Sequence, residues 1–270
     1  MRPRLHSDIA AEILDLGRLE SFKVIDAHGH MGRFSGIYFP KPEAPAVVDT
    51  MDRCGVEWLV FAHHDAMQNP DLGNPRAQQA VDAFPRRLLA YCALSPNYPD
   101  TLNQWVARFP ALRGFAGYKL LAAYYKAPIT LPACEPLWRH AHEAQLPVLL
   151  HTWGGDTCAG CRQVDEIATR YPQARILMGH SQFGDWDNAI ELARRHPNVY
   201  CELCAAYSAN GVIKKMVDAG IEDKVLYGTD IPWFDPMHGI GCVIFADITD
   251  TARRKILRDN AARIFQRWIA

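Results

Sequence analysis

The sequence predicts a single-domain α/β protein that folds as a closed (β/α)8 TIM barrel with a short helical N-terminal extension. About eight short apolar runs recur along the 270 residues at intervals of roughly 20 to 35 residues, and segments with helical periodicity separate them. This alternation implies a parallel sheet, and eight units match a closed barrel better than an open sheet. An open dinucleotide-binding sheet would need a Gly-x-Gly-x-x-Gly turn after its first strand, and none follows residues 24–27.

The elements follow in order along the chain. Residues 1–22 are expected to form the helical extension and to cover the bottom of the barrel, and residues 23–270 to form the barrel domain. After the first strand, at 24–30, a Gly/Pro-rich loop at 32–45 has the composition of a partly ordered lid. The remaining strands are expected near residues 56–62, 88–93, 114–120, 147–150, 174–179, 199–203 and 225–227, with a closing helix at 250–270.

Composition narrows the class of partner. The formal net charge is −1, from 29 basic and 30 acidic residues, which gives no electrostatic case for binding nucleic acid or an anionic membrane. No apolar segment approaches the roughly 20 residues that span a bilayer, and the N-terminus lacks a signal-peptide core. We therefore expect a cytoplasmic protein with a small-molecule substrate, and leave open whether it forms a homodimer.

The eight cysteines are expected to be reduced thiols. Cys158 and Cys161, and Cys201 and Cys204, have the Cys-x-x-Cys spacing of structural zinc sites and redox pairs. In an extended strand, however, residues three apart face opposite sides, which disfavours a shared ion for the second pair. Packing is therefore the favoured role, with structural zinc and a redox pair as weaker alternatives.

A His-x-His pair ends the first predicted strand. Side chains two apart on a strand share a face, so His28 and His30 are expected to point the same way, as a metal site would require. A second pair, His140 and His142, lies in a run of helical composition. Residues two apart on a helix point about 200° from each other, so this second pair is not expected to share an ion.

Ionisable residues also end later strands, where a parallel barrel should be apolar. A barrel gathers the C-terminal ends of its strands around one axis, where barrel enzymes keep their active sites. Several imidazoles and one carboxylate there would be a complete ligand set for a catalytic zinc-type ion. Besides His28 and His30, the residues concerned are Lys119, His151, His180 and Asp230.

This ordered set resembles the amidohydrolase superfamily, and within it the amidohydrolase-related branch of aminocarboxymuconate-semialdehyde decarboxylase, resorcylate-type decarboxylases and several lactonases. The segments 117–120 and 258–265 are similar to that branch as well. The resemblance implies that one divalent ion, most commonly Zn2+, is bound by His28, His30, His151 and Asp230. It implies that His180 touches the metal-bound water or the substrate, or binds a second metal. Lys119 lies where two-metal relatives carry a carboxylated lysine, although a positioning role is favoured here.

The expected chemistry follows from such an ion, which lowers the pKa of bound water from about 15.7 towards 7. Asp230 would act as general base and then protonate the leaving group, while His180 would stabilise the oxyanion. Arg33, Trp153 and Trp233 are the candidate substrate-binding residues, because a guanidinium suits a carboxylate and indole rings suit a flat molecule.

The leading functional hypothesis is a metal-dependent hydrolase that cleaves a C–O or C–N bond of a small carboxylate or aromatic molecule. The alternative is a non-oxidative decarboxylase or hydratase of an aromatic or unsaturated carboxylic acid. A third hypothesis is a barrel that binds a ligand without turning it over. The adjacent His63 and His64 end the second strand, where only one of the two can face inwards, and neither is assigned to the site.

Overall fold

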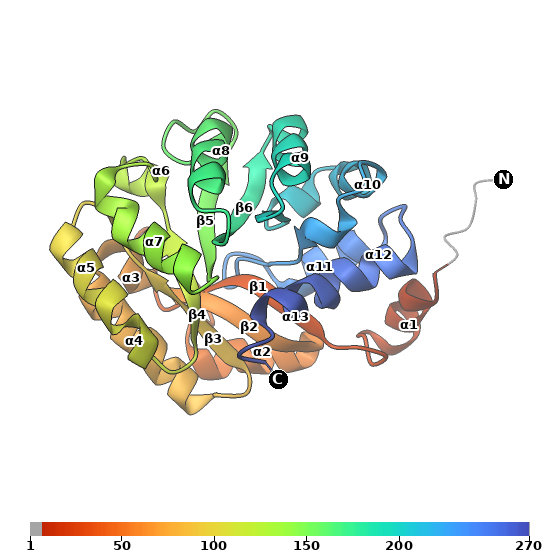
Figure 1. Cartoon of the computed structure of the whole chain (residues 1–270). Helices are drawn as coiled ribbons and strands as arrows, with labels where there is room; N and C mark the ends of the chain where they lie inside the picture. The colour runs from red at the N-terminus through yellow and green to blue at the C-terminus, as the bar shows by residue number, and fades with distance from the viewer. Residues whose placement is uncertain (1–6, 270) are drawn as a thin grey trace.

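Eight parallel strands form one sheet in the order β1 to β8 in this computed structural model, which describes residues 7–269 (Figure 1). Helices alternate with the strands, as the repeated apolar runs predict. All eight predicted strands are present, and β5 and β6 extend beyond their predicted ends. The strands are β1 (Val24–Met31), β2 (Val56–His63), β3 (Leu88–Ala93), β4 (Phe115–Leu120), β5 (Pro147–Trp153), β6 (Arg175–Phe183), β7 (Val199–Glu202) and β8 (Val225–Leu226).

The ring closes where the last strand meets the first. β8 is only two residues long, so the loop that follows it supplies part of the pairing with β1. We call this junction the seam. Three backbone hydrogen bonds cross it: Ala27 N to Tyr227 O (3.0 Å), Asp230 N to His28 O (2.7 Å) and His30 N to Ile231 O (2.6 Å).

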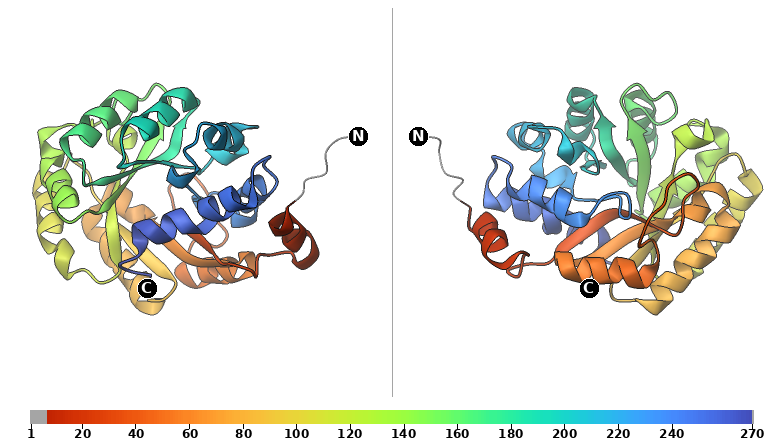
Figure 2. Two further views of the ribbon diagram at one scale, coloured as in Figure 1. Left: turned by 45° about the vertical axis from the view of Figure 1, so that its right-hand side comes forward. Right: turned by 180° about the vertical axis from the view of Figure 1, so that it is seen from behind.

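Helices surround the strands on the outside of the ring (Figure 2). None of the helices described between residues 7 and 269 combines the length and apolarity that crossing a bilayer would require. The α-helices are α1 (Asp8–Leu16), α2 (Ala44–Cys54), α3 (His64–Gln68), α4 (Pro70–Ala83), α5 (Pro99–Arg108), α6 (Ala122–Tyr125), α7 (Glu135–Glu143), α8 (Cys161–Arg170), α9 (Trp186–Arg195), α10 (Val212–Asp218), α11 (Pro236–Ile244), α12 (Asp250–Arg254) and α13 (Asn260–Phe265). A π-turn, η5 (Lys255–Asp259), joins α12 to α13, and short 3-10 turns are η1 (Phe109–Ala111), η2 (Pro132–Cys134), η3 (Ala206–Ser208) and η4 (Glu222–Lys224).

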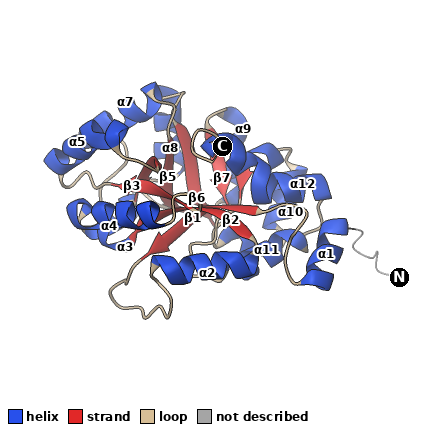
Figure 3. Cartoon of the chain, turned by 90° about the horizontal axis from the view of Figure 1, so that it is seen from below, coloured by secondary structure: helices blue, strands red, loops and turns tan. Residues whose placement is uncertain are grey.

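The buried apolar residues form two clusters. The larger lies between strands and helices, and the smaller combines strand residues such as Leu89 and Leu177 with residues of α13. Phe265 of α13 lies 6.3 Å from Tyr91 between ring centroids, so α13 closes the bottom of the barrel. The expectation that the N-terminal extension covers the bottom is therefore wrong for residues 7–22, and residues 1–6 lie outside the described residues. Its helix α1 lies outside the ring, on the side of α12 (Figure 3). The Ser7 hydroxyl donates a hydrogen bond to the Asp250 carboxylate at the start of α12 (2.5 Å).

The strand ends that carry polar residues are buried. Every residue of β1 is buried, including Asp26, His28 and His30, because a barrel strand has neighbours on both faces. Burying a polar group is costly unless it has a partner, so each of these residues requires a local explanation. All eight cysteines are free thiols, as expected.

Candidate metal centre

Two histidines and one carboxylate converge at the C-terminal end of the barrel. Nε2 of His30 lies 3.1 Å and Nε2 of His28 3.5 Å from Oδ1 of Asp230. The candidate ligand atoms of these three residues all lie within 4.8 Å of one another. The strand context places both histidine side chains towards Asp230, as the two-residue period predicts. The seam brings the carboxylate, more than 200 positions away in the sequence, to the same point.

The Nδ1 atoms of both histidines, which point away from Asp230, are engaged in hydrogen bonds. Nδ1–H of His28 donates to Oε2 of Glu202 (2.7 Å), and Nδ1–H of His30 donates to the carbonyl of Ala62 (3.1 Å). These partners assign the tautomer in which the Nε2 lone pair of each ring faces inwards. Metal-binding histidines are held in the same way, by a carboxylate or carbonyl on the nitrogen remote from the ion.

Asp26 explains how β1 and the loop after β8 are held together. Its carboxylate accepts hydrogen bonds from the backbone N–H groups of His28 (3.1 Å) and Thr229 (3.0 Å), and from the Thr229 hydroxyl. Burial raises the pKa of Asp26 to about 7, against the lowering effect of these bonds. The next residue after Thr229, Asp230, has a left-handed φ of +65°, which turns its side chain back into the barrel.

The end of β6 contains three consecutive left-handed residues. His180, Ser181 and Gln182 have φ values of +65°, +49° and +53°, a strained run for residues with side chains. The hydroxyl of Ser181 donates to the Glu202 carbonyl (2.7 Å), and the backbone N–H of His180 donates to the Glu202 carboxylate (3.3 Å). Nδ1–H of His180 donates to the Cys204 carbonyl (3.2 Å), so its Nε2 is also free to face inwards. Strain of this kind is typical of functional sites.

His151 lies further from His28 than the other predicted ligands do, with the His180 ring between them. Its ring centroid is 4.7 Å from that of His180, which in turn is 5.3 Å from His28. Neither of the two ligand groups found within 4.8 Å in residues 7–269 includes His151. Its buried Nδ1 has no hydrogen-bond partner within the described part of the chain. The structure thus brings three of the four predicted ligands together, and the role of His151 as a ligand stays a prediction.

Lys119 is fully buried on β4, and its Nζ donates to Nε2 of His28 (2.8 Å). The lysine therefore contacts the lone pair that a metal would use. Burial lowers the pKa of Lys119, although the carboxylates of Asp230 and Glu202 oppose that effect. The geometry agrees with a positioning role and gives no contact that tests carboxylation.

The electrostatics of the cluster favour neutral imidazoles beside an ionised carboxylate. Burial lowers the pKa of His151 to about 2 and that of His180 to about 3. Burial alone would raise the pKa of Asp230, but His28, His30 and His180 hold it well below its ordinary value. Neutral imidazole and ionised carboxylate are the protonation states that bind metals.

The surroundings of one buried polar atom favour a bound cation. Oδ1 of Asp230 is buried and accepts no hydrogen bond of acceptable geometry from residues 7–269, although two imidazole nitrogens lie beside it. Buried polar atoms are otherwise almost always paired. Nitrogen lone pairs and a carboxylate oxygen facing one point are the donor set of a zinc-type ion. The residues present therefore fit a divalent cation.

The predicted substrate-binding residues are separated. Trp153, which is 41% exposed, stacks on Phe183 and lies parallel to His151 at the mouth of the centre. Trp233 packs edge-on against Phe39 of the 32–45 loop and donates from Nε1 to Nε2 of His64 (3.1 Å).

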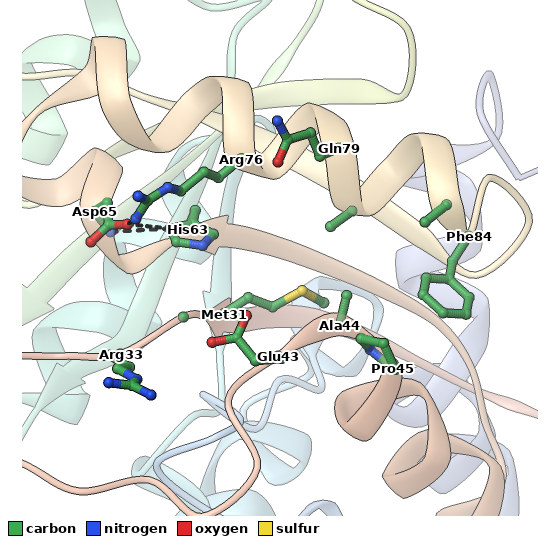
Figure 4. A pocket seen from close by; sticks show the side chains of 13 residues that line it. Met31, Arg33, Glu43, Ala44, Pro45, His63, Asp65, Arg76, Gln79 and Phe84 are labelled. Carbon is green, nitrogen blue, oxygen red and sulfur yellow. Dashed lines mark hydrogen bonds and ion pairs between the residues drawn. The ribbon is translucent and has the colours of Figure 1, made fainter.

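Arg33 lies elsewhere. It is exposed and lines a cleft of about 620 Å3 beside α2 and α4. Figure 4 shows it at the edge of this cleft, apart from the Arg76–Asp65 pair. The residues that line the cleft include His63 but none of the four predicted ligands. The structure thus gives Arg33 no contact with the centre, and its binding role stays a prediction.

Three residues near the centre were not assigned to it from the sequence. Glu202 is buried and bonds His28, and an acidic residue inside an apolar strand was the available signal. His64 faces inwards and stacks on His30 at 4.9 Å, while its neighbour His63 lines the outer cleft. Cys204 has its sulfur within 4.8 Å of candidate nitrogens of His28 and His180.

Comparisons with known proteins show the family and the fold of this chain. The sequence model of a family described as Amidohydrolase matches residues 25–267. Gamma-resorcylate decarboxylases of Rhizobium radiobacter and of a Rhizobium species are each 23% identical over 299 aligned residues, covering 90% of this chain and 85% of the relative.

Solved structures show the same fold. A 2,6-dihydroxybenzoate decarboxylase from Rhizobium superposes with a TM-score of 0.72 at 17% identity, covering 91% of this chain and 99% of the other. A 5-carboxyvanillate decarboxylase from Novosphingobium aromaticivorans, complexed with manganese, gives a TM-score of 0.71 at 14% identity, covering 91% and 96%.

Proposed function

The chain belongs to the amidohydrolase family, and from that premise we propose that it is a metal-dependent, non-oxidative decarboxylase of an aromatic carboxylic acid. The sequence alone favoured hydrolysis and kept decarboxylation as the alternative. The relatives reverse that order, because both curated matches are named decarboxylases. The observation that carries the metal-dependent part is the convergence of His28, His30 and Asp230 on one point.

His28, His30 and Asp230 would hold the ion, with His180 and His151 beside it. When bound, a divalent ion supplies a Lewis acid that neutralises and anchors the negative charge of a carboxylate substrate. The donor set is typical of Zn2+, which is the ion we expect. A relative of this fold was crystallised with manganese, so Mn2+ is included in the tests.

Asp230 is proposed to carry the proton. In non-oxidative decarboxylation a ring carbon gains a proton, its bond to the carboxylate breaks, and the released electron pair restores the aromatic ring as CO2 leaves. The surrounding histidines keep Asp230 ionised at rest, so it must first accept a proton, and a hydroxyl group of the substrate is a suitable source. The Asp230 side chain is 14% exposed and is thus within reach of a bound molecule.

Aromatic side chains at the mouth suit a planar substrate. Trp153 lies parallel to His151, and Tyr124, which is 56% exposed, meets the same imidazole edge-on at 5.1 Å. Flat rings beside the centre favour a benzoate-type acid over a flexible aliphatic one.

The test is product analysis with the purified protein loaded with Zn2+ or Mn2+. 2,6-Dihydroxybenzoate and 5-carboxyvanillate are supplied in parallel with simple lactones and aryl esters, and CO2 release is measured against ring opening. We expect CO2 from an aromatic acid and its loss in Asp230→Asn. Lactone or ester cleavage without CO2 would instead support hydrolysis.

A further inference from the structure

Cys204, a residue outside the predicted ligand set, lies against the metal centre. It follows β7 by two residues and is fully buried. Its Sγ, a candidate nitrogen of His28 and one of His180 all lie within 4.8 Å of one another. This group is one of two that could hold an ion within residues 7–269, and the other is His28, His30 and Asp230.

Both ligand groups contain His28, so the nitrogen that His28 offers decides whether the two groups can surround the same ion. Nδ1 of His28 is bonded to Glu202 (2.7 Å), so an ion could bind only at Nε2, where it would replace the hydrogen bond from Lys119 (2.8 Å). One imidazole nitrogen binds one ion. An ion on this nitrogen would have Asp230 as a neighbour, because Oδ1 of Asp230 lies 3.5 Å from it. Cys204 and His180 form the other group, which contains the same histidine.

The backbone around Cys204 is held by residues of the same centre. Its N–H donates to Oε1 of Glu202 (2.7 Å), and its carbonyl accepts from Nδ1–H of His180 (3.2 Å). The following residue, Ala205, has a left-handed φ of +57°, so the chain turns sharply after the cysteine. Both backbone groups of Cys204 are thus engaged, and the sulfur faces the imidazoles.

Cys201, which lies on β7 itself, provides a built-in comparison. It is equally buried, but its Sγ lies 3.8 Å from the carbonyl of Ala189 on α9, in the layer between sheet and helices. Cys204 lies beyond the end of β7 with its sulfur near His28 and His180, so one cysteine of the pair faces the helices and the other the centre.

We propose that Cys204 supplies a thiolate ligand to the ion, which makes the centre a mixed histidine, carboxylate and thiolate site. This rests on the metal centre of the proposed function and adds to it. Binding exchanges the S–H bond for a sulfur–metal bond and releases one proton to solvent. Thiolate favours Zn2+ and Co2+ over the harder Mn2+, so the cysteine sets the metal preference.

The experiment is absorption spectroscopy of the whole chain loaded with Co2+, compared with Cys204→Ser and with the matched control Cys201→Ser. We expect one equivalent of Co2+ to give a near-ultraviolet sulfur-to-cobalt charge-transfer band. The band should disappear in Cys204→Ser and persist in Cys201→Ser. Competition between Zn2+ and Mn2+, read by elemental analysis, should show the preference for Zn2+ falling at least about tenfold in Cys204→Ser only.

The outcomes separate the two proposals. Stoichiometric Co2+ without the band, and with the same spectrum in both variants, would overturn the thiolate and leave the metal centre standing. Failure of the wild-type chain to bind Co2+, Zn2+ or Mn2+ would overturn both. A Cys204→Ser variant that unfolds is replaced by titrating the wild-type chain with Zn2+ and counting protons, where release of no proton from the thiol overturns the inference.

Discussion

The molecule contains two His-x-His pairs, and only one of them builds a site. On β1, His28 and His30 lie 5.4 Å apart between ring centroids and both direct Nε2 towards Asp230. On α7, Nδ1 of His140 bonds the Tyr118 hydroxyl (2.7 Å), while Nδ1 of His142 accepts from the backbone N–H of Gln173 (3.1 Å).

The difference lies in the backbone that carries the pair. A strand repeats every two residues and places both rings on one face, whereas a helix turns the second ring about 200° away from the first. The β1 pair also gains a carboxylate behind it, in Glu202, and another in front of it, in Asp230. The same His-x-His pattern therefore forms a candidate metal site only where the secondary structure and the neighbouring side chains bring ligands together.

The largest expected effect comes from removing one ring of each pair. His28→Ala should lose both stoichiometric metal and catalytic turnover, because it removes the histidine that both candidate ligand groups contain. His140→Ala should keep both. Elemental analysis after dialysis and CO2 release measure the two quantities. Equal metal content in the two variants would remove the distinction between the pairs.

A smaller effect is expected from the residue behind the ring. Glu202→Gln keeps the size of the side chain but removes the charge that holds His28, so metal affinity should fall by about 10- to 100-fold. Tyr118→Phe, which removes the corresponding partner of His140, should leave metal affinity unchanged. Competition with a chromophoric chelator gives both affinities. An unchanged affinity in Glu202→Gln would show that the carboxylate does not position the ring.

The smallest effect is a difference in pH dependence in the metal-free protein. Burial lowers the pKa of His151 to about 2, whereas unfolded histidine titrates near 6.5. Below pH 6.5 the unfolded chain therefore binds a proton on this histidine, whereas the folded chain does not. The contribution to the free energy of unfolding is fully present above pH 6.5 and is lost as the pH falls below it. His151→Gln should therefore reduce the slope of unfolding free energy against pH by about 1.4 kcal/mol per pH unit around pH 5.

Urea unfolding of the chelated wild-type and variant proteins at several pH values measures that slope. His140, whose pKa burial also lowers but which is only half-buried, is the matched position on α7. His140→Gln should change the slope less than His151→Gln. An equal slope in wild type and His151→Gln would mean that His151 is protonated in the folded protein.

The sequence predicted the elements that depend on local pattern. Apolar runs separated by helical segments placed all eight strands, since a strand buried on both faces must be apolar along its length. The same rule made His28 and Asp230 conspicuous at the strand ends. Barrel topology then explains why residues so far apart in the sequence meet.

What the sequence could not predict depends on contacts made at a distance. Glu202 meets His28 across 174 positions, and nothing within β7 indicates that partner. The two-residue period cannot choose between His63 and His64, and the structure turns His64 inwards. The amphipathic pattern of the N-terminal extension predicts that one of its faces is buried but does not identify the surface that buries it. The extension was therefore expected to cover the bottom of the barrel, which α13 covers instead.

The seam gives the fold a dependence on its ion. Two of the three backbone hydrogen bonds that close the ring between β8 and β1 involve His28, His30 or Asp230, whose side chains face the centre. An ion that binds the folded chain alone adds about 2.7 kcal/mol of stability at a free concentration of 100 times its Kd. This stabilisation applies to the seam, which contains the shortest strand of the ring, β8. Metal starvation should therefore lower the amount of intact protein in a cell, through proteolysis of opened chains, as well as the activity of each molecule.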